Sequence, residues 1–229
     1  GIGKTTLEMV ATNHLAYVYR DGCLWANMVE YAGRPTALLK RFITHYSQET
    51  PNLNEPDSLT ELLRQFLASK RVLIVADHLD DVKDLKYLNK LVSAGRATLL
   101  VITNHETVTQ QMSATIFEVN SLTDDDAFRL LKQQSQYQVE PTDENIRKLM
   151  RRSRNHPATL VQIAVQMRHS PNRKLEEWVA SLEGIPLAAI DPEEVATAIY
   201  RNTYKLLSAE QQRLLRLLGI LGQAKYRPD

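Results

Sequence analysis

Cysteine, net charge and long apolar runs are scarce in this sequence. Cys23 is the single cysteine among 229 residues, so no disulfide forms within the chain. This fits a reducing cytoplasm, where we expect the protein, and Cys23 is best interpreted as a small core residue. No apolar stretch reaches the roughly 18 residues of a membrane-spanning helix. The formal net charge of +1 provides no global attraction to nucleic acid or to an anionic membrane, so neither partner is indicated.

Hydrophobic residues make up 43% of the chain and charged residues 24%, which is the balance of an ordinary globular protein with a buried core. The length allows one or two domains. Composition alone excludes the extreme classes of protein, so the motifs have to carry any functional assignment.

The sequence opens with Gly1-Ile2-Gly3-Lys4-Thr5-Thr6-Leu7, which matches the distal half of the phosphate-binding pattern G-x-x-x-x-G-K-[ST]. Such a loop binds phosphate because glycine lets the backbone approach an anion and because the following helix presents its N-terminal N–H groups. Here Gly3 allows that approach, and Lys4 reaches the β- and γ-phosphate oxygens. Thr5 is a candidate ligand of Mg²⁺, and Thr6 is placed to bond the α-phosphate. We expect every residue before Leu7 to contribute to a nucleotide site.

The phosphate-binding pattern is incomplete at its start. Its first glycine, and the buried strand that feeds such a loop, are missing from the sequence, so we expect the chain to be a fragment. The helix after the loop is expected to turn Leu7, Val10 and Ala11 towards a sheet.

Four apolar runs are expected to be strands. They are Cys23 to Val29, Val72 to Ala76, Ala97 to Ile102, and Ile116 to Val119. The second and third lack polar alternation, which is typical of parallel strands covered on both faces. With helices between the runs, the sequence predicts an α/β fold with a doubly wound parallel sheet, in which ligands bind at the carboxyl ends of the strands.

Helices are expected between these strands. The first starts at Pro35 and has an apolar face made of Leu38, Leu39, Phe42 and Ile43. Ser58 and Glu61 have the spacing of a capping box, in which each side chain bonds the backbone N–H of the other, ahead of a leucine-rich helix.

From Leu122 onward the strand signal stops, which marks a domain boundary. Thr123 is the expected cap of a helix with three aspartates in its first turn, and Thr142 with Asp143 and Glu144 is expected to start the next. Pro157 opens a third helix, with an apolar face made of Leu160, Ile163, Ala164 and Met167.

The remaining helices are predicted from their ends. A helix that contains Trp178 is expected to stop at Gly184, and another opens at Asp191-Pro192-Glu193. Ser208 with Gln211 has the spacing of a second capping box, ahead of a leucine-rich helix.

Asp77 and His78 end the second predicted strand. A carboxylate here, in a sheet that starts with a phosphate loop, is the candidate ligand of Mg²⁺, directly or through water. The alternative is an aspartate that only caps the strand. His78 stands where a residue that positions the attacking water is expected, and an imidazole with a pKa of ~6.5 is a candidate catalytic base. The alternative, an ordinary histidine at a strand end, is the interpretation we favour.

Thr103 and Asn104 follow the third predicted strand, close to the expected position of a γ-phosphate. Their side chains are candidates for sensing that phosphate by hydrogen bonding, and a turn built from good turn residues is the alternative.

A basic cluster stands at a helix end. It consists of Arg147, Lys148, Arg151, Arg152 and Arg154. A surface for nucleic acid or an acidic partner is one interpretation. A solvated helix face that interacts with the helix dipole is the other, and we favour it.

Together these motifs resemble the nucleotide-binding domain of the STAND NTPases, in particular the NB-ARC type found in bacterial regulators, plant resistance proteins and apoptosis activators. The opening loop looks like the family's phosphate loop, Arg71 to Asp77 like its second kinase motif, and Leu99 to Asn104 like its sensor strand. Asn155-His156-Pro157-Ala158-Thr159-Leu160 resembles its Gly-Leu-Pro-Leu-Ala-Leu motif, whose proline packs near the adenine. The resemblance therefore implies an adenine contact for Pro157.

The resemblance also implies an organisation and a function. Residues 1–120 would be a P-loop α/β domain without its first strand, 121–190 a helical domain, and 191–229 the beginning of a winged-helix domain. ATP or ADP with Mg²⁺ would be the cofactors of a signal-transduction switch, in which nucleotide exchange controls domain opening. Self-association in the ATP-bound state, and effector or sensor domains outside the chain, are the implied partners.

Three departures from the family pattern bear on activity. His78 stands in place of a second acidic residue, Asn104 in place of the sensor arginine, and Asn155-His156 in place of Gly-Leu. The first two argue against efficient hydrolysis and leave the residues for binding intact. Slow ATPase activity is therefore one hypothesis, and a pseudo-ATPase that serves as an interaction scaffold is the other.

Overall fold

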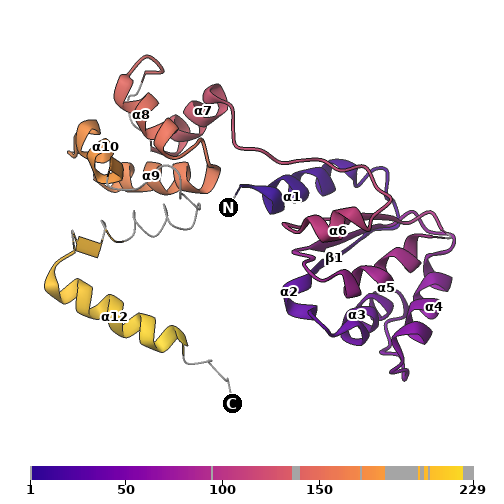
Figure 1. Ribbon diagram of the computed structural model, residues 1–229. Coiled ribbons are helices and arrows are strands. Elements are labelled where there is room, and N and C mark those ends of the chain that lie inside the picture. Colours follow the sequence, from indigo (N-terminus) through magenta and orange to yellow (C-terminus); the bar gives the residue numbers. More distant parts are fainter. Residues whose placement is uncertain are drawn as a thin grey trace. The chain divides into compact units, whose positions relative to one another are not determined.

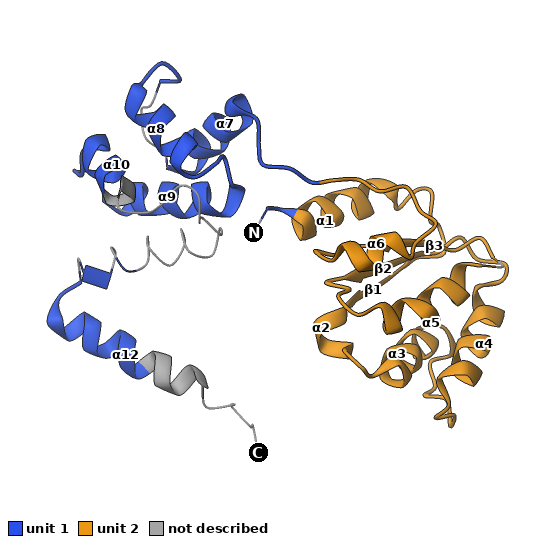
Figure 2. Ribbon diagram, in the orientation of Figure 1, with its two compact units in different colours: residues 1–3, 119–229 blue, residues 4–118 orange. Residues whose placement is uncertain are grey.

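A computed structural model describes residues 2–93, 95–135, 140–170, 172–183, 201, 204–205 and 207–223. The chain forms two compact units, one of residues 4–118 and one of residues 1–3 with 119–229 (Figure 2). The helix stop predicted at Gly184 and the helix start predicted at Asp191 lie outside the described residues. No helix in the described part combines the length and the apolar character needed to cross a membrane.

Residues 4–118 form a mixed α/β unit around a small parallel sheet. Strands β1 (Cys23–Asn27), β2 (Leu73–Asp77) and β3 (Thr98–Val101) lie in the order β1-β2-β3, and both neighbouring pairs are parallel. Every residue of β2 is buried, as expected for a central parallel strand covered on both faces. The prediction of a mixed α/β fold with a parallel sheet is confirmed.

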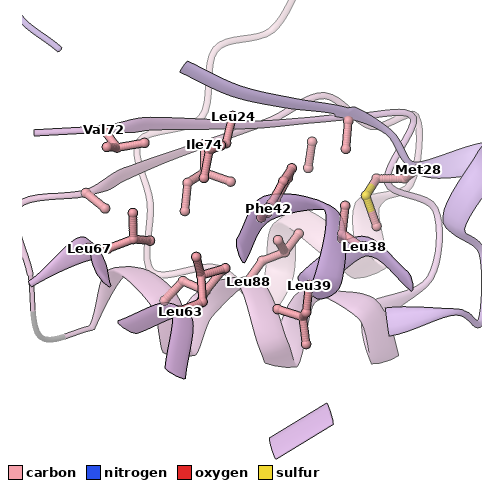
Figure 3. Close-up of a cluster of buried hydrophobic side chains, with 14 of the residues drawn as sticks. Leu24, Met28, Leu38, Leu39, Phe42, Leu63, Leu67, Val72, Ile74 and Leu88 are labelled. Carbon is pink, nitrogen blue, oxygen red and sulfur yellow. The ribbon is translucent and has the colours of Figure 1, made fainter. Parts of the chain in front are cut away.

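Helices cover both faces of this sheet (Figure 1). On one face pack α3 (Pro35–Ser47), α4 (Pro56–Leu67) and α5 (Val82–Val92), whose apolar side chains meet those of Leu24 and Ile74 (Figure 3). On the other lies α1 (Lys4–Leu15). Two short helices, α2 (Met28–Tyr31) and α6 (Glu106–Gln110), follow β1 and β3. The predicted face of α3 is confirmed, since all of its members are buried: Leu38, Leu39, Phe42 and Ile43.

Helix α4 begins earlier than the sequence pattern predicts. It starts at Pro56, so Ser58 and Glu61 lie inside the helix and the capping box expected for them is wrong. Proline is favoured at the first helical position because its φ angle is already helical and because its missing N–H would have no acceptor there. The leucine face of α4 is nevertheless buried, through Leu59, Leu63 and Leu67.

Helix α1 turns a different face inward from the one predicted. Leu7 is 55% exposed and Val10 is 50% exposed, whereas Glu8 is only 4% exposed. The prediction that Leu7 and Val10 face the sheet is therefore wrong. Apolar residues are spread around α1 rather than gathered in one stripe, so hydropathy does not decide its orientation. A hydrogen bond from Thr5 to Asp77 instead ties its first turn to β2.

The fourth predicted strand is not formed. Residues 115–119 have no regular secondary structure, and Ile116 and Phe117 are 62% and 82% exposed. A strand requires a neighbour for its backbone N–H and C=O groups, and none of the described strands pairs with this run. Within the described residues the sheet ends at β3.

The helical part of the second unit has its own core. It is built from α7 (Asp124–Ser135), α8 (Glu144–Arg152), α9 (Pro157–His169) and α10 (Leu175–Glu183). The predicted face of α9 is confirmed, since all of its members are buried: Leu160, Ile163, Ala164 and Met167.

The helix starts predicted for this unit are confirmed where the structure describes them. The hydroxyl of Thr123 accepts a backbone N–H in the first turn of α7 at 3.2 Å. Before α12 (Ala209–Gln223), Ser208 and Gln211 form the expected reciprocal bonds of 3.0 and 3.2 Å. Helix α8 begins at Glu144 within the predicted stretch, and its cap is Asp143, whose side chain accepts the backbone N–H of Asn145.

Candidate functional site

The carboxylate of Asp77 stands at the carboxyl end of the central strand β2. Its side chain is almost fully buried, with 1% of the residue exposed. One oxygen, Oδ2, accepts a hydrogen bond of 3.0 Å from the hydroxyl of Thr5, at the start of α1. The other, Oδ1, makes no hydrogen bond among the described residues but lies 3.2 Å from a ring nitrogen of His78. The fold therefore brings together a hydroxyl and a carboxylate that are 72 positions apart in sequence.

Lys4 lies beside the loop that follows β3. Its ammonium Nζ donates a hydrogen bond to the side-chain oxygen of Asn104. Since β2 and β3 are parallel, their carboxyl ends meet at one edge of the sheet, and the N-terminus of α1 lies at that edge. Lys4, Thr5, Asp77 and Asn104 are thus gathered in one place.

The approach to α1 suits an anion. Gly3 has a φ angle of +95°, in the left-handed region that favours glycine, and apart from its chain neighbours no described atom lies within 4 Å of where its Cβ would stand. The backbone N–H groups that open α1 have no intrahelical acceptor. Among the other predicted loop residues, Ile2 is half-buried and Thr6 is exposed, while Gly1 lies outside the described residues.

His78 lies next to Asp77. Its backbone has a φ angle of +57°, which histidine tolerates better than most residues, and its side chain is 48% exposed. The ring nitrogen Nδ1 lies 3.2 Å from Oδ1 of Asp77. The imidazole therefore faces the carboxylate and is open to solvent at the same time.

Thr103 has a local partner. Its hydroxyl accepts a hydrogen bond of 2.9 Å from the backbone N–H of His105, which closes a turn after β3. The structure therefore joins Asn104 to Lys4 and engages Thr103 in the turn.

Glu8 is a member of this region that the sequence analysis missed. It lies on α1 and is 4% exposed. Its carboxylate is hydrogen-bonded to the side chain of Trp25 on β1, and its second oxygen, Oε2, has no partner among the described residues. Burial raises the pKa of Glu8, and the negative charge of Asp77 raises it further. The sequence signal that could have identified Glu8 is its spacing. It follows Thr5 by three positions and Lys4 by four, which puts all three residues on one side of a helix.

Pro157 belongs to the helical unit, where it is the first residue of α9. Just before it, Asn155 has a φ angle of +53°, in the region where glycine is favoured and asparagine is among the best tolerated of other residues. Its side-chain amide donates a hydrogen bond of 2.6 Å to Asp124, and its backbone oxygen accepts one of 3.2 Å from Leu122. Asparagine thus tolerates this backbone conformation and ties the turn to the start of α7.

The residues at the sheet edge fit a phosphate with a magnesium ion. Lys4 and the N-terminus of α1 match the charge of a phosphate, and Thr5 with Asp77 offers the oxygen ligands that Mg²⁺ prefers. No group of three or more His, Cys, Asp or Glu side chains with metal-binding geometry occurs among the described residues.

A glycine-lysine-threonine turn at a helix N-terminus, next to a carboxylate at the end of a central parallel strand, defines the class of P-loop nucleotide-binding proteins. The chain belongs to the NB-ARC family within that class, because the NB-ARC domain matches residues 1–140. The family resemblance seen in the motifs is confirmed. Family membership makes the chain a nucleotide-binding module of the ATP/ADP type.

Two curated plant proteins are similar to the chain. It is 27% identical to TMV resistance protein N of Nicotiana glutinosa over 195 residues, which is 80% of this chain and 17% of that protein. It is 27% identical to Disease resistance-like protein DSC1 of Arabidopsis thaliana over 135 residues, which is 57% of this chain and 11% of that protein. The matched part of the chain thus spans less than a fifth of the length of either relative.

Proposed function

We propose that the chain is the ATP/ADP-dependent switch module of a larger signal-transduction protein. The observation that carries this proposal is the hydrogen bond of 3.0 Å between Thr5 and Asp77, because it joins the phosphate-loop helix to the strand end that would hold a metal. The names of the two plant relatives, both resistance or resistance-like proteins, support a signalling context.

In this proposal each polar residue at the sheet edge has a role towards the nucleotide. Lys4 and the backbone of Gly1 to Gly3 bind the β- and γ-phosphates, and Thr6 bonds the α-phosphate. Thr5 and Asp77 hold Mg²⁺, which supplies charge neutralisation at the phosphates when bound. Thr103 and Asn104 sense the γ-phosphate.

A second set of roles concerns the rest of the chain. Residues 1–120 form the α/β domain, 121–190 the helical domain, where Pro157 contacts the adenine, and 191–229 the start of a winged-helix domain. A nucleotide that touches more than one domain shifts their arrangement by its differential affinity for closed and open forms. ADP then holds the closed form, and exchange for ATP favours opening and self-association.

A degenerate pseudo-ATPase that acts as an interaction scaffold is the second candidate. It is favoured by the placement of His78 and Asn104, since a histidine next to Asp77 and an amide next to Lys4 supply neither a carboxylate base nor an additional positive charge. The scaffold would retain the fold and the nucleotide and would not cycle between forms.

The switch is tested by the size of the full-length protein in two nucleotide states. We expect the protein to have a larger hydrodynamic radius or a larger oligomeric mass when it is bound to a non-hydrolysable ATP analogue with Mg²⁺ than when it is bound to ADP. Size-exclusion chromatography with light scattering measures both quantities. The same radius and mass in the two nucleotides, both shown to be bound, would favour the scaffold.

Asp77→Ala separates a metal-binding role from a structural one. We expect the affinity of the full-length protein for Mg²⁺-ATP to fall by at least about tenfold, with a smaller loss for ADP in the presence of EDTA, because the lost contact is to the metal. Calorimetry gives both affinities. Asp57→Ala, which removes an exposed carboxylate of the same α/β unit, is the matched control. Equal losses for the two ligands would show that Asp77 acts on the fold instead.

A further inference from the structure

Glu8 is a buried carboxylate whose hydrogen bonding is only half satisfied. It is 4% exposed, and Oε2 has no partner among the described residues, while the hydrogen bond to Trp25 engages its carboxylate only once. A buried carboxylate without partners costs free energy, and a protein retains one where something compensates for that cost. No described arginine or lysine forms an ion pair with Glu8.

A second buried carboxylate stands in the same region. Asp77 is 1% exposed, and its Oδ1 makes no hydrogen bond among the described residues, although it lies 3.2 Å from Nδ1 of the half-exposed His78. The two groups are close enough for the charge of Asp77 to act on Glu8. Two like charges in a low-dielectric site repel each other, so the arrangement favours a cation between or beside them.

The geometry of α1 puts Glu8 on the side of the helix that carries the phosphate-loop residues. It follows Lys4 by four positions and Thr5 by three, and residues at these spacings are neighbours on a helix surface. Thr5 is also the residue that donates to Asp77. Thr5 and Glu8 therefore lie on one side of α1, where Thr5 bonds Asp77 of β2 and Glu8 bonds Trp25 of β1, and the charge of Asp77 acts on Glu8.

We propose that Glu8 is a positioning residue of the divalent-cation site, and that its unpartnered Oε2 accepts hydrogen bonds from the water around a cation held by Thr5 and Asp77. This inference rests on the proposed function. Mg²⁺ keeps several of its waters in protein sites, and those waters need acceptors, which outer carboxylates supply. Glu8 adds negative charge to the cation without touching the nucleotide.

The test uses Glu8→Gln in the full-length protein, because glutamine keeps the size and the hydrogen bond to Trp25 and removes the charge. Two measurements are made: Mn²⁺ affinity in the presence of ADP, by electron paramagnetic resonance, and ADP affinity in EDTA, by calorimetry. We expect Mn²⁺ affinity to fall by about ten- to a hundredfold, the usual cost of losing an outer partner of a metal ligand, with no loss of metal-free ADP affinity. Glu30→Gln, an exposed glutamate on α2, should match the parent in both.

Each other result counts against the inference. Parent-like Mn²⁺ affinity in a folded Glu8→Gln variant would overturn the inference and leave the proposed function in place. An equal loss of ADP affinity with and without metal would do the same. If Glu8→Gln does not fold, Glu8→Asp takes its place: it keeps the charge and withdraws the oxygens by one methylene, and parent-like Mn²⁺ affinity would again overturn the inference. A parent that binds no ADP would overturn the proposed function and this inference together.

Discussion

Lys4→Ala is expected to weaken ADP binding to the full-length protein by about a hundredfold or more. Lys4 is the residue of the phosphate loop that carries a mobile positive charge, and truncating one partner of a desolvated charge pair costs about 2–5 kcal/mol. The substitution also removes the hydrogen bond to Asn104, so the loop after β3 loses its tie to α1. Isothermal titration calorimetry with ADP and Mg²⁺ measures the effect.

Lys83→Ala is the matched control for that substitution. Lys83 is an exposed lysine near the start of α5 in the same α/β unit, so its removal changes the net charge equally without touching the sheet edge. It should bind ADP as the parent does. Undiminished ADP affinity in Lys4→Ala would remove the basis for placing the phosphates at the N-terminus of α1.

Placing an acidic residue at position 78 and a basic residue at position 104, as in the family pattern, is expected to raise ATP turnover. In the variant with His78→Asp and Asn104→Arg, we predict single-turnover hydrolysis at saturating ATP at least about a hundredfold faster than in the full-length parent. Phosphoryl transfer depends on positioning water and neutralising charge on the γ-phosphate, and one stabilising arginine is worth about 10³–10⁵ in rate. His78 and Asn104 supply neither a carboxylate nor that positive charge.

The structure adds two constraints to this experiment. The φ angle of +57° at His78 is one that aspartate tolerates well, so His78→Asp carries little backbone penalty. Arginine at position 104 cannot accept the hydrogen bond from Lys4 and puts two cations side by side. The single variants separate these effects, and ADP affinity should stay close to the parent's in both. A parent that already turns over several times per second, or a double variant that is slower, would show that the catalytic positions are elsewhere.

The sheet and its main core could be predicted because their signals are local. Residues 72–76 form an uninterrupted apolar run, and β2 is the fully buried strand that such a run indicates. The helical period of α3 likewise specifies its buried face. The gathering of Thr5 with Asp77 follows from one general rule, since the carboxyl ends of parallel strands meet at one edge of a sheet.

The wrong predictions in the α/β unit have two causes. At one helix start two sequence signals competed, and at one predicted strand the sequence did not show whether a neighbouring strand was present. At α4 a capping-box spacing competed with Pro56, and the proline determined the start. At Ile116 to Val119 the apolar pattern was strand-like, but a strand also depends on a neighbour, which one run cannot specify.

Glu8 was missed for a different reason. Hydropathy predicts that glutamate lies on the solvent side of a helix, whereas Glu8 is buried and interacts with Trp25, which comes from a distant part of the chain. The bond between Lys4 and Asn104, 100 positions apart, could be placed only approximately for the same reason.

The turn at Asn155 links the start of α7 to the start of α9. Its side-chain amide donates a hydrogen bond to Asp124, the first residue of α7, and its carbonyl accepts one from Leu122, while the same turn leads directly into α9. Glycine would suit the φ angle of +53° and would lose the bond to Asp124. Asparagine therefore combines the backbone conformation of the turn with a side-chain bond that couples the beginnings of these two helices, and Asn155→Gly would remove that coupling without straining the backbone.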